Sequence, residues 1–331
     1  MPKGRRSLLA GAVAGAVAMP VLARPALGQG GTGFPSRPLR IIVPAVAAGG
    51  SDTTTRILIP PFAAALGQAA IADNRPGGSG NLANELLAQA PPDGHTLQMG
   101  TIGNLVVNAL IQKTLPVLPV RDFTHVSLSV QVTNLLVAPA DRPWRSVADL
   151  VAAARARPGS LSYGSSGVGS AGHLAGALLD QVAGIEGVHV PYRGGGQLIA
   201  DILSGKVDYA FATAATTLEH VQTGRLRALA VPTAERSALV PQVPTMAETG
   251  VPGYSVVNWY ALVAPKGVPT PVVAQLNAAL GTALADPEAV RKLAQQGIEP
   301  LPSTPEACTA FMQAETAKWA EVVKAARIGE G

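Results

Sequence analysis

The sequence predicts an α/β fold, because short runs rich in β-branched residues alternate with segments that have helical spacing of apolar residues. Residues 39–43 form the first such run, which Pro44 ends, and a Gly-rich turn then leads into the helical segment 53–66. Ser51 or Asp52 is suited to cap that helix. Alternation of strand and helix favours a parallel sheet with helices packed against it. The length of 331 residues fits two domains of about 150 residues each.

The same alternation continues along the chain and places most elements, with Pro- and Gly-rich breakers between them, as at 91–94 and 158–159. The expected strands are 39–43, 69–73, 96–100, 134–138, 161–164, 187–190, 206–211 and 226–231, with 254–264 extended. The expected helices are 53–66, 81–90, one that Ser146 caps and that runs to Arg157, 170–183, 195–204, 215–223 and three within 270–326. Two α/β lobes with a ligand crevice at the carboxyl ends of the strands would follow.

The formal net charge of +4 comes from the N-terminal segment alone. Residues 1–28 hold four basic residues and no acidic one, so residues 29–331 carry equal numbers of acidic and basic residues. No cluster of Lys and Arg follows residue 28, which excludes a nucleic-acid-binding surface. The single cysteine, Cys308, excludes an internal disulfide and a cysteine-based zinc site, and its place on a helix indicates an inert buried thiol.

The N-terminal segment has the layout of an export signal. Lys3, Arg5 and Arg6 precede an uncharged run at 7–23, and small residues suited to cleavage follow. The run is short for a bilayer span and rich in Gly and Ala, which disfavours a permanent anchor. The adjacent arginines leave both the Sec and the twin-arginine (Tat) routes open. We expect residues 1–28 to be removed as a signal peptide and the mature protein to be soluble in a bacterial periplasm.

A loop rich in Gly and Ser, residues 163–174, lies between an expected strand and an expected helix. Glycines allow a ligand to come close, and the amides at a helix start attract a carboxylate or phosphate. Ser165, Ser166 and Ser170 add hydroxyl donors, and the plainer alternative is an ordinary turn with a serine cap. Residues 167–172 also fit the dinucleotide pattern G-x-G-x-x-G, but the next strand ends without the acidic residue that such a site needs.

The turn at 44–52 is a second Gly-containing loop between an expected strand and an expected helix, with open amides at the helix start. Asp52 is placed either to fix this loop or to hold an amine. The chain contains no serine-hydrolase elbow, phosphate-binding P-loop or zinc motif. Its histidines are scattered without metal-ligand spacing, and we expect neither a metal nor a cofactor. His173, just after the Gly/Ser loop, would orient that loop or bond a ligand carboxylate. Asp208 would point into the crevice or cap the next loop.

Several segments together resemble the substrate-binding proteins of tripartite tricarboxylate transporters, the Bug or TctC-like family. The resemblance runs from about Phe34 to Glu315. Its segments are F-P-S-R-P-L-R-I-I-V-P at 34–44, G-G-S-D at 49–52, N-R-P-G at 74–77, P-D-G-H-T-L at 92–97, the loop at 163–174, H-V-P-Y-R-G-G-G at 189–196, G-R-L-R-A-L-A-V at 224–231 and P-Q-V-P-T-M-A-E-T-G at 241–250. Their order and spacing together make the assignment specific.

The resemblance implies a type II periplasmic binding protein, in which residues 34–132 with 259–331 form one α/β lobe, residues 133–258 form the other, and a ligand cleft lies between them. The chain would cross near Thr133 and return near Asn258. The first loop would grip a carboxylate through backbone amides and waters, and the second lobe would add the Gly/Ser loop. The ligand-binding residues expected on this basis are Ala47, Ala48, Gly49, Gly50, Ser51, Asp52, Thr101, Ser165, Ser166, Gly167, Gly169, Ser170, His173 and Asp208.

This chain departs from the family at the first loop, which often reads P-F-A-P-G-G-G-T-D. Here Ala45 replaces the Phe, Ala47 the Pro and Ala48 the first Gly. These losses would make the cleft roomier and the loop less fixed, which favours a bulkier or aromatic carboxylate over the usual small dicarboxylate.

The resemblance implies a receptor rather than an enzyme. As a monomer, it would capture a small organic carboxylate between its lobes and deliver it to the membrane permease subunits of a tripartite tricarboxylate transporter. One alternative is a ligand sensor that docks on a two-component system. Another is an exported hydrolase that uses His173 with a serine, although it lacks an elbow, a paired acid and a metal site.

Overall fold

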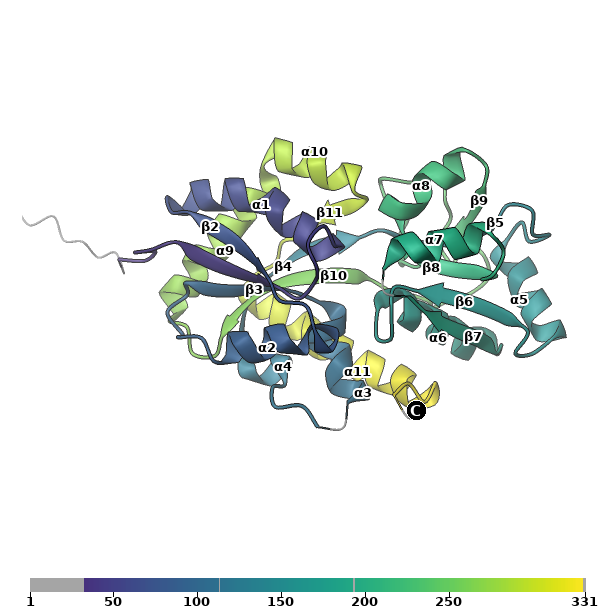
Figure 1. The fold of residues 1–331 in the computed structure, drawn as a ribbon, viewed down its shortest axis with the longest axis horizontal. Coiled ribbons are helices and arrows are strands. Elements are labelled where there is room, and N and C mark those ends of the chain that lie inside the picture. The colour runs from purple at the N-terminus through teal and green to yellow at the C-terminus, as the bar shows by residue number, and fades with distance from the viewer. Residues whose placement is uncertain (1–32, 113, 193, 330–331) are drawn as a thin grey trace, which may run out of the picture. The chain divides into compact units, whose positions relative to one another are not determined.

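A computed structural model of the chain describes residues 33–112, 114–192 and 194–329. The predicted signal peptide at 1–28 lies outside these residues. From Gly33 onward the chain forms one compact unit built on two β-sheets with helices packed against them (Figure 1). The two predicted binding loops follow strands of different sheets.

Among the described residues, the first sheet has six strands in the order β11–β4–β10–β3–β1–β2. These are β1 (Leu39–Val43), β2 (Ala70–Asn74), β3 (Thr96–Thr101), β4 (Phe123–Val132), β10 (Asn258–Pro265) and β11 (Ile298–Pro300). Strand β1 is parallel to β2 and β3, whereas β10 runs antiparallel to β3 and β4, and β11 runs antiparallel to β4. The carboxyl ends of β1 and β3 therefore meet at the same edge of the sheet.

Helices cover both faces of this sheet (Figure 1). They are α1 (Gly50–Leu66), η1 (Gly78–Gly80), α2 (Asn81–Ala88), the π-helical turn η2 (Gly103–Val107), α3 (Asn108–Ile111), α4 (Pro119–Asp122), α9 (Thr270–Ala285), α10 (Pro287–Gln295) and α11 (Pro305–Ala325). Side chains alternate along a strand. Ile41 accordingly packs into a core with α1, α9 and α10, while Ile42 packs into a core with α2 and α11.

The second sheet has five strands within the described residues, in the order β7–β6–β8–β5–β9. These are β5 (Asn134–Pro139), β6 (Leu161–Ser165), β7 (Gly187–Pro191), β8 (Tyr209–Thr213) and β9 (Leu226–Ala230). Strand β6 is parallel to β7 and β8, and β5 runs antiparallel to β8 and β9. Its helices are α5 (Val147–Ala156), α6 (Ala171–Ala183), α7 (Gly195–Leu203) and α8 (Ala214–Gln222).

Most of the predicted elements are confirmed to within a few residues. Ser146 caps α5 as predicted, in a reciprocal capping box with Asp149. The prediction of a parallel sheet is confirmed for β1, β2 and β3 but is wrong for β10, because the chain leaves the first sheet after β4 and returns as β10, antiparallel to β3 and β4. Strands β4 and β11 and the short helices between 103 and 122 were not predicted. Strand β8 begins at Tyr209, not at 206.

The chain passes between the sheets at two neighbouring places. Strand β4 leads through Thr133 into β5, and a long connection after β9 leads back into β10 at Asn258. The Asn258 side chain donates to Asn134 Oδ1 at 3.1 Å, which links the two crossings. Glu299 of β11 accepts hydrogen bonds there from Thr133 and Ser237. The residue bounds of the two lobes stay a prediction, because contacts within Gly33–Gly331 define one compact unit.

A buried carboxylate joins the second crossing to the C-terminal helix. Glu315 of α11 accepts hydrogen bonds from the indole N–H of Trp259 in β10 at 3.0 Å and from that of Trp319 at 2.8 Å. Both tryptophans are fully buried. Lys318 lies 3.4 Å from the same carboxylate and donates to the Ser255 carbonyl just before β10. Glu315 therefore satisfies polar groups that no water can reach.

We predict that Glu315→Ala lowers the free energy of unfolding by about 2–4 kcal/mol, because two buried indole N–H groups lose their acceptor. Urea denaturation measures the change. Glu321→Ala, at an exposed position on the same helix, is the control and should stay within about 0.5 kcal/mol of the parent. A loss below about 1 kcal/mol in Glu315→Ala would contradict this role.

Candidate functional site

The first predicted loop joins β1 to α1 and leaves the start of that helix without a capping side chain. In the loop at 44–49, Gly49 occupies the N-cap position and offers no side chain. Helix geometry leaves the amides of the first turn, those of Gly50, Ser51 and Asp52, without acceptors inside the helix. Aligned peptide dipoles give this end about half a positive charge, so it is suited to bind a carboxylate.

The carboxylate of Asp52 holds this loop in place. It is 2% exposed and accepts hydrogen bonds from the Ala48 N–H at 2.7 Å, from Arg56 Nε at 2.9 Å and from Asn74 Nδ2 at 2.9 Å. Burial alone would raise the pKa of Asp52, but these hydrogen bonds together lower it below its ordinary value. Asn74 also donates to the Ala45 carbonyl. Asp52 therefore fixes the loop, which is one of the two roles predicted for it, and the expectation that the loop is less fixed than in the family stays a prediction.

Two backbone features shape the same loop. Ala48 has a φ of 63°, in the left-handed region where a Cβ is crowded and glycine is favoured. At Gly50, an added Cβ would lie 2.9 Å from the hydroxyl of Tyr260 in β10. Glycine at position 50 therefore allows the helix start to approach the sheet closely.

The second predicted loop follows β6 and begins at a serine that is bonded inside the protein. Ser165 is fully buried, and its Oγ accepts a hydrogen bond from the Gly167 N–H at 3.2 Å and lies 2.7 Å from His189 Nε2. Ser166, by contrast, is exposed. Ser165 therefore shapes the loop, and Ser166 is the serine that a ligand can reach.

The start of α6 closes this loop through a serine cap and a histidine. Ser170 Oγ accepts a hydrogen bond from the His173 N–H at 3.3 Å, and its own O–H can still be donated to a ligand. His173 Nδ1 accepts from the Gly169 N–H at 3.1 Å. His173 therefore orients the loop, which is one of the two roles predicted for it.

A pair of stacked histidines lies beneath the second loop. The rings of His173 and His189 have centroids 3.7 Å apart and an interplanar angle of 8°, and Tyr163 packs 5.0 Å from His189. Burial lowers the pKa of His173 to about 4. Burial, and then the neighbouring His173, lower the pKa of His189 to about 3. Both rings are therefore neutral near pH 7, and the loop carries no histidine charge.

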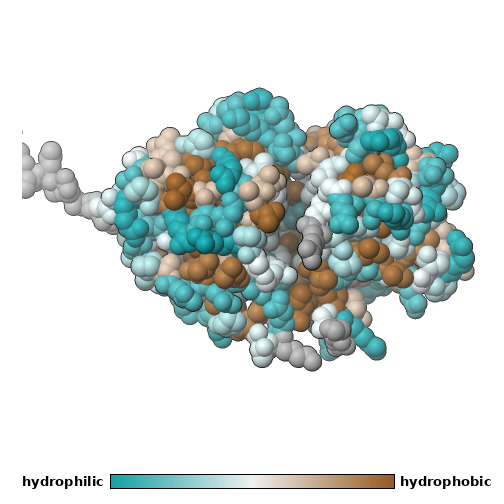
Figure 2. All heavy atoms as spheres, in the orientation of Figure 1, coloured by the Kyte–Doolittle hydropathy of each residue, from teal (hydrophilic) through white to brown (hydrophobic). Residues whose placement is uncertain are grey.

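The elements that carry the two loops meet around η2. A Cβ added at Gly103, the first residue of η2, would lie 3.4 Å from the carbonyl oxygen of Gly169 in the second loop. A Cβ added at Gly80 would lie 2.7 Å from the Cβ of Asn104 in η2 and 3.1 Å from that of Pro44. Since Pro44 begins the first loop, both loops border this region. Figure 2 shows the surface hollowed between the elements of the two sheets.

Thr101, at the end of β3, lies in the same region. Its N–H and hydroxyl both donate to Asn104 Oδ1, at 2.8 and 3.1 Å. Asn104 donates in turn to Asn84 at 2.7 Å, so a buried amide network supports this edge of the sheet. Sequence reasoning missed Asn104 and Tyr260, because neither belongs to a motif. The position of Asn104 just beyond the carboxyl end of a strand is the one signal that could have found it.

The prediction that Asp208 lines the crevice is wrong. Asp208 precedes β8, and its carboxylate accepts from the N–H and hydroxyl of Ser162 at 2.8 and 3.0 Å and pairs with Arg142 at 2.8 Å. Ser162 is near the start of β6, whereas the binding loop follows the other end of that strand. Because β8 starts later than predicted, Asp208 lies at the amino end of this strand. It links β8 there to the start of β6, at the edge of the sheet opposite the binding loop.

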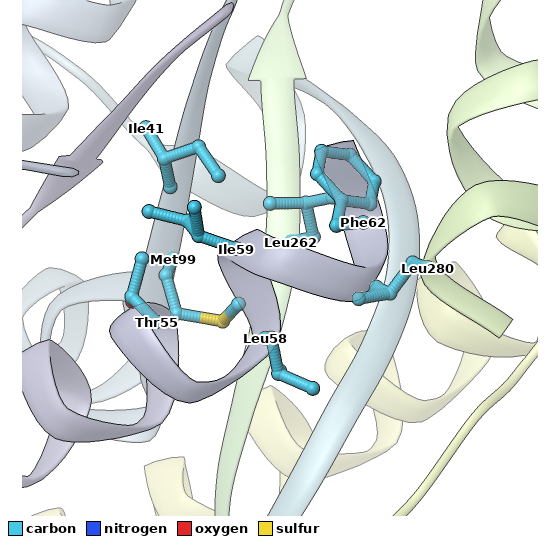
Figure 3. Close-up of a pocket in the computed structure, with 8 residues that line it drawn as sticks. All are labelled: Ile41, Thr55, Leu58, Ile59, Phe62, Met99, Leu262 and Leu280. Atoms are coloured by element: carbon cyan, nitrogen blue, oxygen red, sulfur yellow. The ribbon is translucent and has the colours of Figure 1, made fainter. Parts of the chain in front are cut away.

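Two cavities border α1. The first, of about 10 Å³, lies on the core face of the helix and has room for about one water (Figure 3). Its lining is almost wholly apolar: Ile41, Thr55, Leu58, Ile59, Phe62, Met99, Leu262 and Leu280. The second is an open hollow of about 460 Å³ on the outer side of α1, bordered by Ala47, Ala48, Asp52, Arg56 and, from α10, Lys292. Only the second has room for a small molecule.

Within the described ranges, no group of His, Cys, Asp and Glu side chains is arranged to hold a metal ion. The thiol of Cys308 is buried, and burial raises its pKa to about 12, in agreement with the inert thiol predicted. None of the helices in the part of the chain that the structure describes has the length and apolar character needed to span a membrane.

Known proteins similar to this chain cover nearly all of its length. The UPF0065 protein in the tcbD–tcbE intergenic region of Pseudomonas sp. (strain P51) is 37% identical over 321 residues, 97% of this chain and 94% of the relative. The structure of R. palustris Rpa4515 with adipate is 36% identical, has a TM-score of 0.80 and covers 89% of this chain and 99% of that one. MatC from Rhodopseudomonas palustris with bound malate is 31% identical, has a TM-score of 0.77 and covers 88% of this chain and 100% of that one.

Two α/β sheets joined by neighbouring crossings, with amide-rich loops that border one region, define a two-lobed protein of the periplasmic solute-binding class. The family model for the tripartite tricarboxylate transporter family receptor matches residues 55–328. The chain belongs to this family of receptors, as its motifs predicted, and the predicted fold class is confirmed.

Ala48→Gly is expected to raise the free energy of unfolding by up to about 1 kcal/mol, because glycine removes the crowding of a Cβ in the left-handed region. Ala47→Gly is the matched control. Ala47 is not among the residues with positive φ, so glycine there should lower stability by about 0.5–1 kcal/mol. Urea denaturation of both variants measures the difference, and equal shifts would contradict the strain assigned to Ala48.

The stacked histidines predict a loss of stability in mild acid. In the unfolded chain they take up protons near pH 6.5, whereas in the folded protein they do so only near pH 4 and 3. The unfolded state therefore binds more protons as pH falls below 6.5, and each histidine lowers the free energy of unfolding by about 1.4 kcal/mol per pH unit.

Asp180 acts in the opposite direction. Burial, partly offset by the Gly187 N–H and reinforced by Glu186, raises its pKa to about 6, so it takes up a proton in the folded state first. The effect of the two histidines on the free energy of unfolding is larger than that of the one aspartate, so stability falls as pH falls. Urea denaturation between pH 7 and 4.5 should show a net fall in the free energy of unfolding. His189→Gln should reduce the slope of this free energy against pH by the equivalent of about one proton. His220→Gln on α8 is the control and should leave the slope unchanged. A slope unchanged in His189→Gln would contradict this assignment.

Proposed function

We propose that this protein captures a small organic carboxylate between its two loops and passes it, chemically unchanged, to the permease subunits of a tripartite tricarboxylate transporter. The observation that carries the proposal is the uncapped start of α1 at Gly49, where first-turn amides face no capping side chain. Relatives that hold adipate and malate support a carboxylate as the ligand. The family description supports the transporter as the partner.

In this proposal the residues of the site fall into two groups. The amides of Ala47, Gly50 and Ser51 and the hydroxyls of Ser166 and Ser170 contact the ligand. The N–H groups of Ala48 and Gly49 are already bonded to the Asp52 carboxylate and to the Val46 carbonyl and so shape the loop. Other members of the predicted set hold these groups in position, and they are Asp52, Thr101, Ser165, Gly167, Gly169 and His173. A carboxylate is then bound by oriented dipoles rather than by a buried cation.

The same geometry supports a receptor without catalysis. Ser165 is the loop serine whose hydroxyl lies against an imidazole nitrogen, 2.7 Å from His189 Nε2, but it is fully buried and cannot meet a substrate. Its histidine is held neutral by burial and stacks on His173. A general base of this kind would have little tendency to take the serine proton near pH 7.

We further propose that residues 1–28 direct export and are removed, and that the mature protein acts as a periplasmic monomer. The basic, then apolar, then small-residue order of this segment supports export. The two lobes, 34–132 with 259–331 and 133–258, close on the ligand by rotation about the crossings at Thr133 and Asn258. The hydrogen bond between Asn258 and Asn134 keeps the crossings together during such a rotation.

A ligand bulkier than the small dicarboxylates is part of the proposal. Ala45, Ala47 and Ala48 leave the first loop without the aromatic ring and the proline of the family pattern. The smaller side chains at these positions leave more space beside the first loop for a larger organic acid.

Calorimetry with adipate, malate and larger organic acids tests the function. Ser166→Ala is expected to weaken binding by about 1 kcal/mol, with unchanged unfolding, because its hydroxyl is exposed. Ser170→Ala is expected to weaken binding equally and also to lower stability by about 1 kcal/mol, because the cap of α6 is lost.

Ser204→Ala, at an exposed position after α7, is the matched control and should leave both quantities unchanged. Unchanged affinity in both loop variants would remove the second loop from the site. Failure of the parent protein to bind any of these acids would overturn the proposed function.

A further inference from the structure

Each of the two loops exposes a valine. Val46, in the first loop, is 63% exposed, and Val168, in the second, is 47% exposed. Surface loops are built mainly from Gly, Pro, Asn, Asp and Ser. The run Pro-Ala-Val-Ala-Ala at 44–48 carries no polar side chain, and its last three residues are exposed. The apolar character of these loop surfaces therefore needs a reason.

Neither valine side chain is required to form its loop. The carbonyl of Val46 accepts a hydrogen bond from the Gly49 N–H at 3.1 Å, so the backbone makes this turn whatever the side chain. Beside Val168, Gly167 and Gly169 make the turn with φ of 130° and 77°. Since the fold gains little from these two side chains, their exposed methyl groups are available to something that covers them.

The loops that carry the two valines border one region. Pro44, at the start of the first loop, lies close to Gly80, which approaches Asn104 in η2, and Gly169, next to Val168 in the second loop, approaches Gly103 in η2. Charge near the first loop is already compensated, because Arg56 is paired with Asp52 at 2.9 Å. A ligand between the loops would meet amides where its carboxylate lies and methyl groups beside them.

We propose that Val46 and Val168 are specificity-determining residues that cover the apolar body of the bound carboxylate when the loops approach each other. The inference rests on the proposed function and narrows its ligand to organic acids with a contiguous hydrocarbon chain or ring. Each methylene that is buried on binding strengthens affinity about three- to fourfold. Short hydroxy acids gain nothing from such a contact.

Straight-chain monocarboxylates test this inference, because the acid group stays the same while the apolar body grows. Calorimetry on the full mature chain would use acetate, butanoate, hexanoate and octanoate, with adipate as a reference acid. For the parent protein, affinity should rise about threefold or more per added methylene until the space is filled.

The variants Val46→Thr and Val168→Thr keep the side-chain volume and replace one methyl by a hydroxyl. Each should weaken hexanoate binding about fivefold and leave acetate binding unchanged, since the hydroxyl is desolvated only by the longer acid. Val188→Thr is the matched control, because Val188 is 50% exposed on the edge strand β7, away from both loops. It should bind every acid as the parent does.

The outcomes separate this inference from the proposed function. Adipate binding with no gain along the series, or threonine variants that match the parent on hexanoate, would overturn the inference and leave carboxylate capture standing. Equal weakening of acetate and hexanoate would also overturn it, because the valines would then act on loop shape. A parent protein that binds none of these acids would overturn both.

Discussion

The first binding loop depends on one buried carboxylate, that of Asp52. As the third residue of α1, Asp52 reaches back past the helix start to the Ala48 amide instead of capping the first turn. The loop is thereby closed while the amides of the first turn stay available to a ligand. Arg56 and Asn74 compensate the negative charge, so an incoming carboxylate meets oriented N–H groups and not an unpaired anion.

The second loop is held in shape by neutral groups. Hydrogen bonds to Ser165, Ser170 and His173 stabilise the loop itself, and burial keeps His173 uncharged near pH 7. Neither loop relies on a net positive surface, which agrees with the balance of acidic and basic residues in 29–331. Affinity for an anion then comes from backbone amides that folding has already placed, so little ordering is left to be done when the ligand binds.

Membership of the receptor family and the departures from its pattern are compatible, because they concern different parts of the loop. The changes at Ala45, Ala47 and Ala48 alter side chains, whereas Asp52 binds the backbone amide of Ala48, which any residue supplies. The support of the loop is therefore kept while its surroundings become smaller and more apolar. Val46, exposed beside them, extends this apolar surface. The chain thus keeps the amides that bind an acid group and replaces the side chains beside them with smaller, apolar ones.

The sequence by itself determined the class of fold, most strands and helices, the cap at Ser146 and the family, because periodicity, breakers and motifs are local properties of the chain. It also located both loops. Only the tertiary structure decided which strands run antiparallel, that Asp208 lies at the far edge of its sheet, and that His173 stacks on His189. These facts depend on contacts between residues distant in the chain, and no local pattern encodes them. For Asp52 the sequence allowed two roles, and the positions of Arg56 and Asn74 around its carboxylate decided between them.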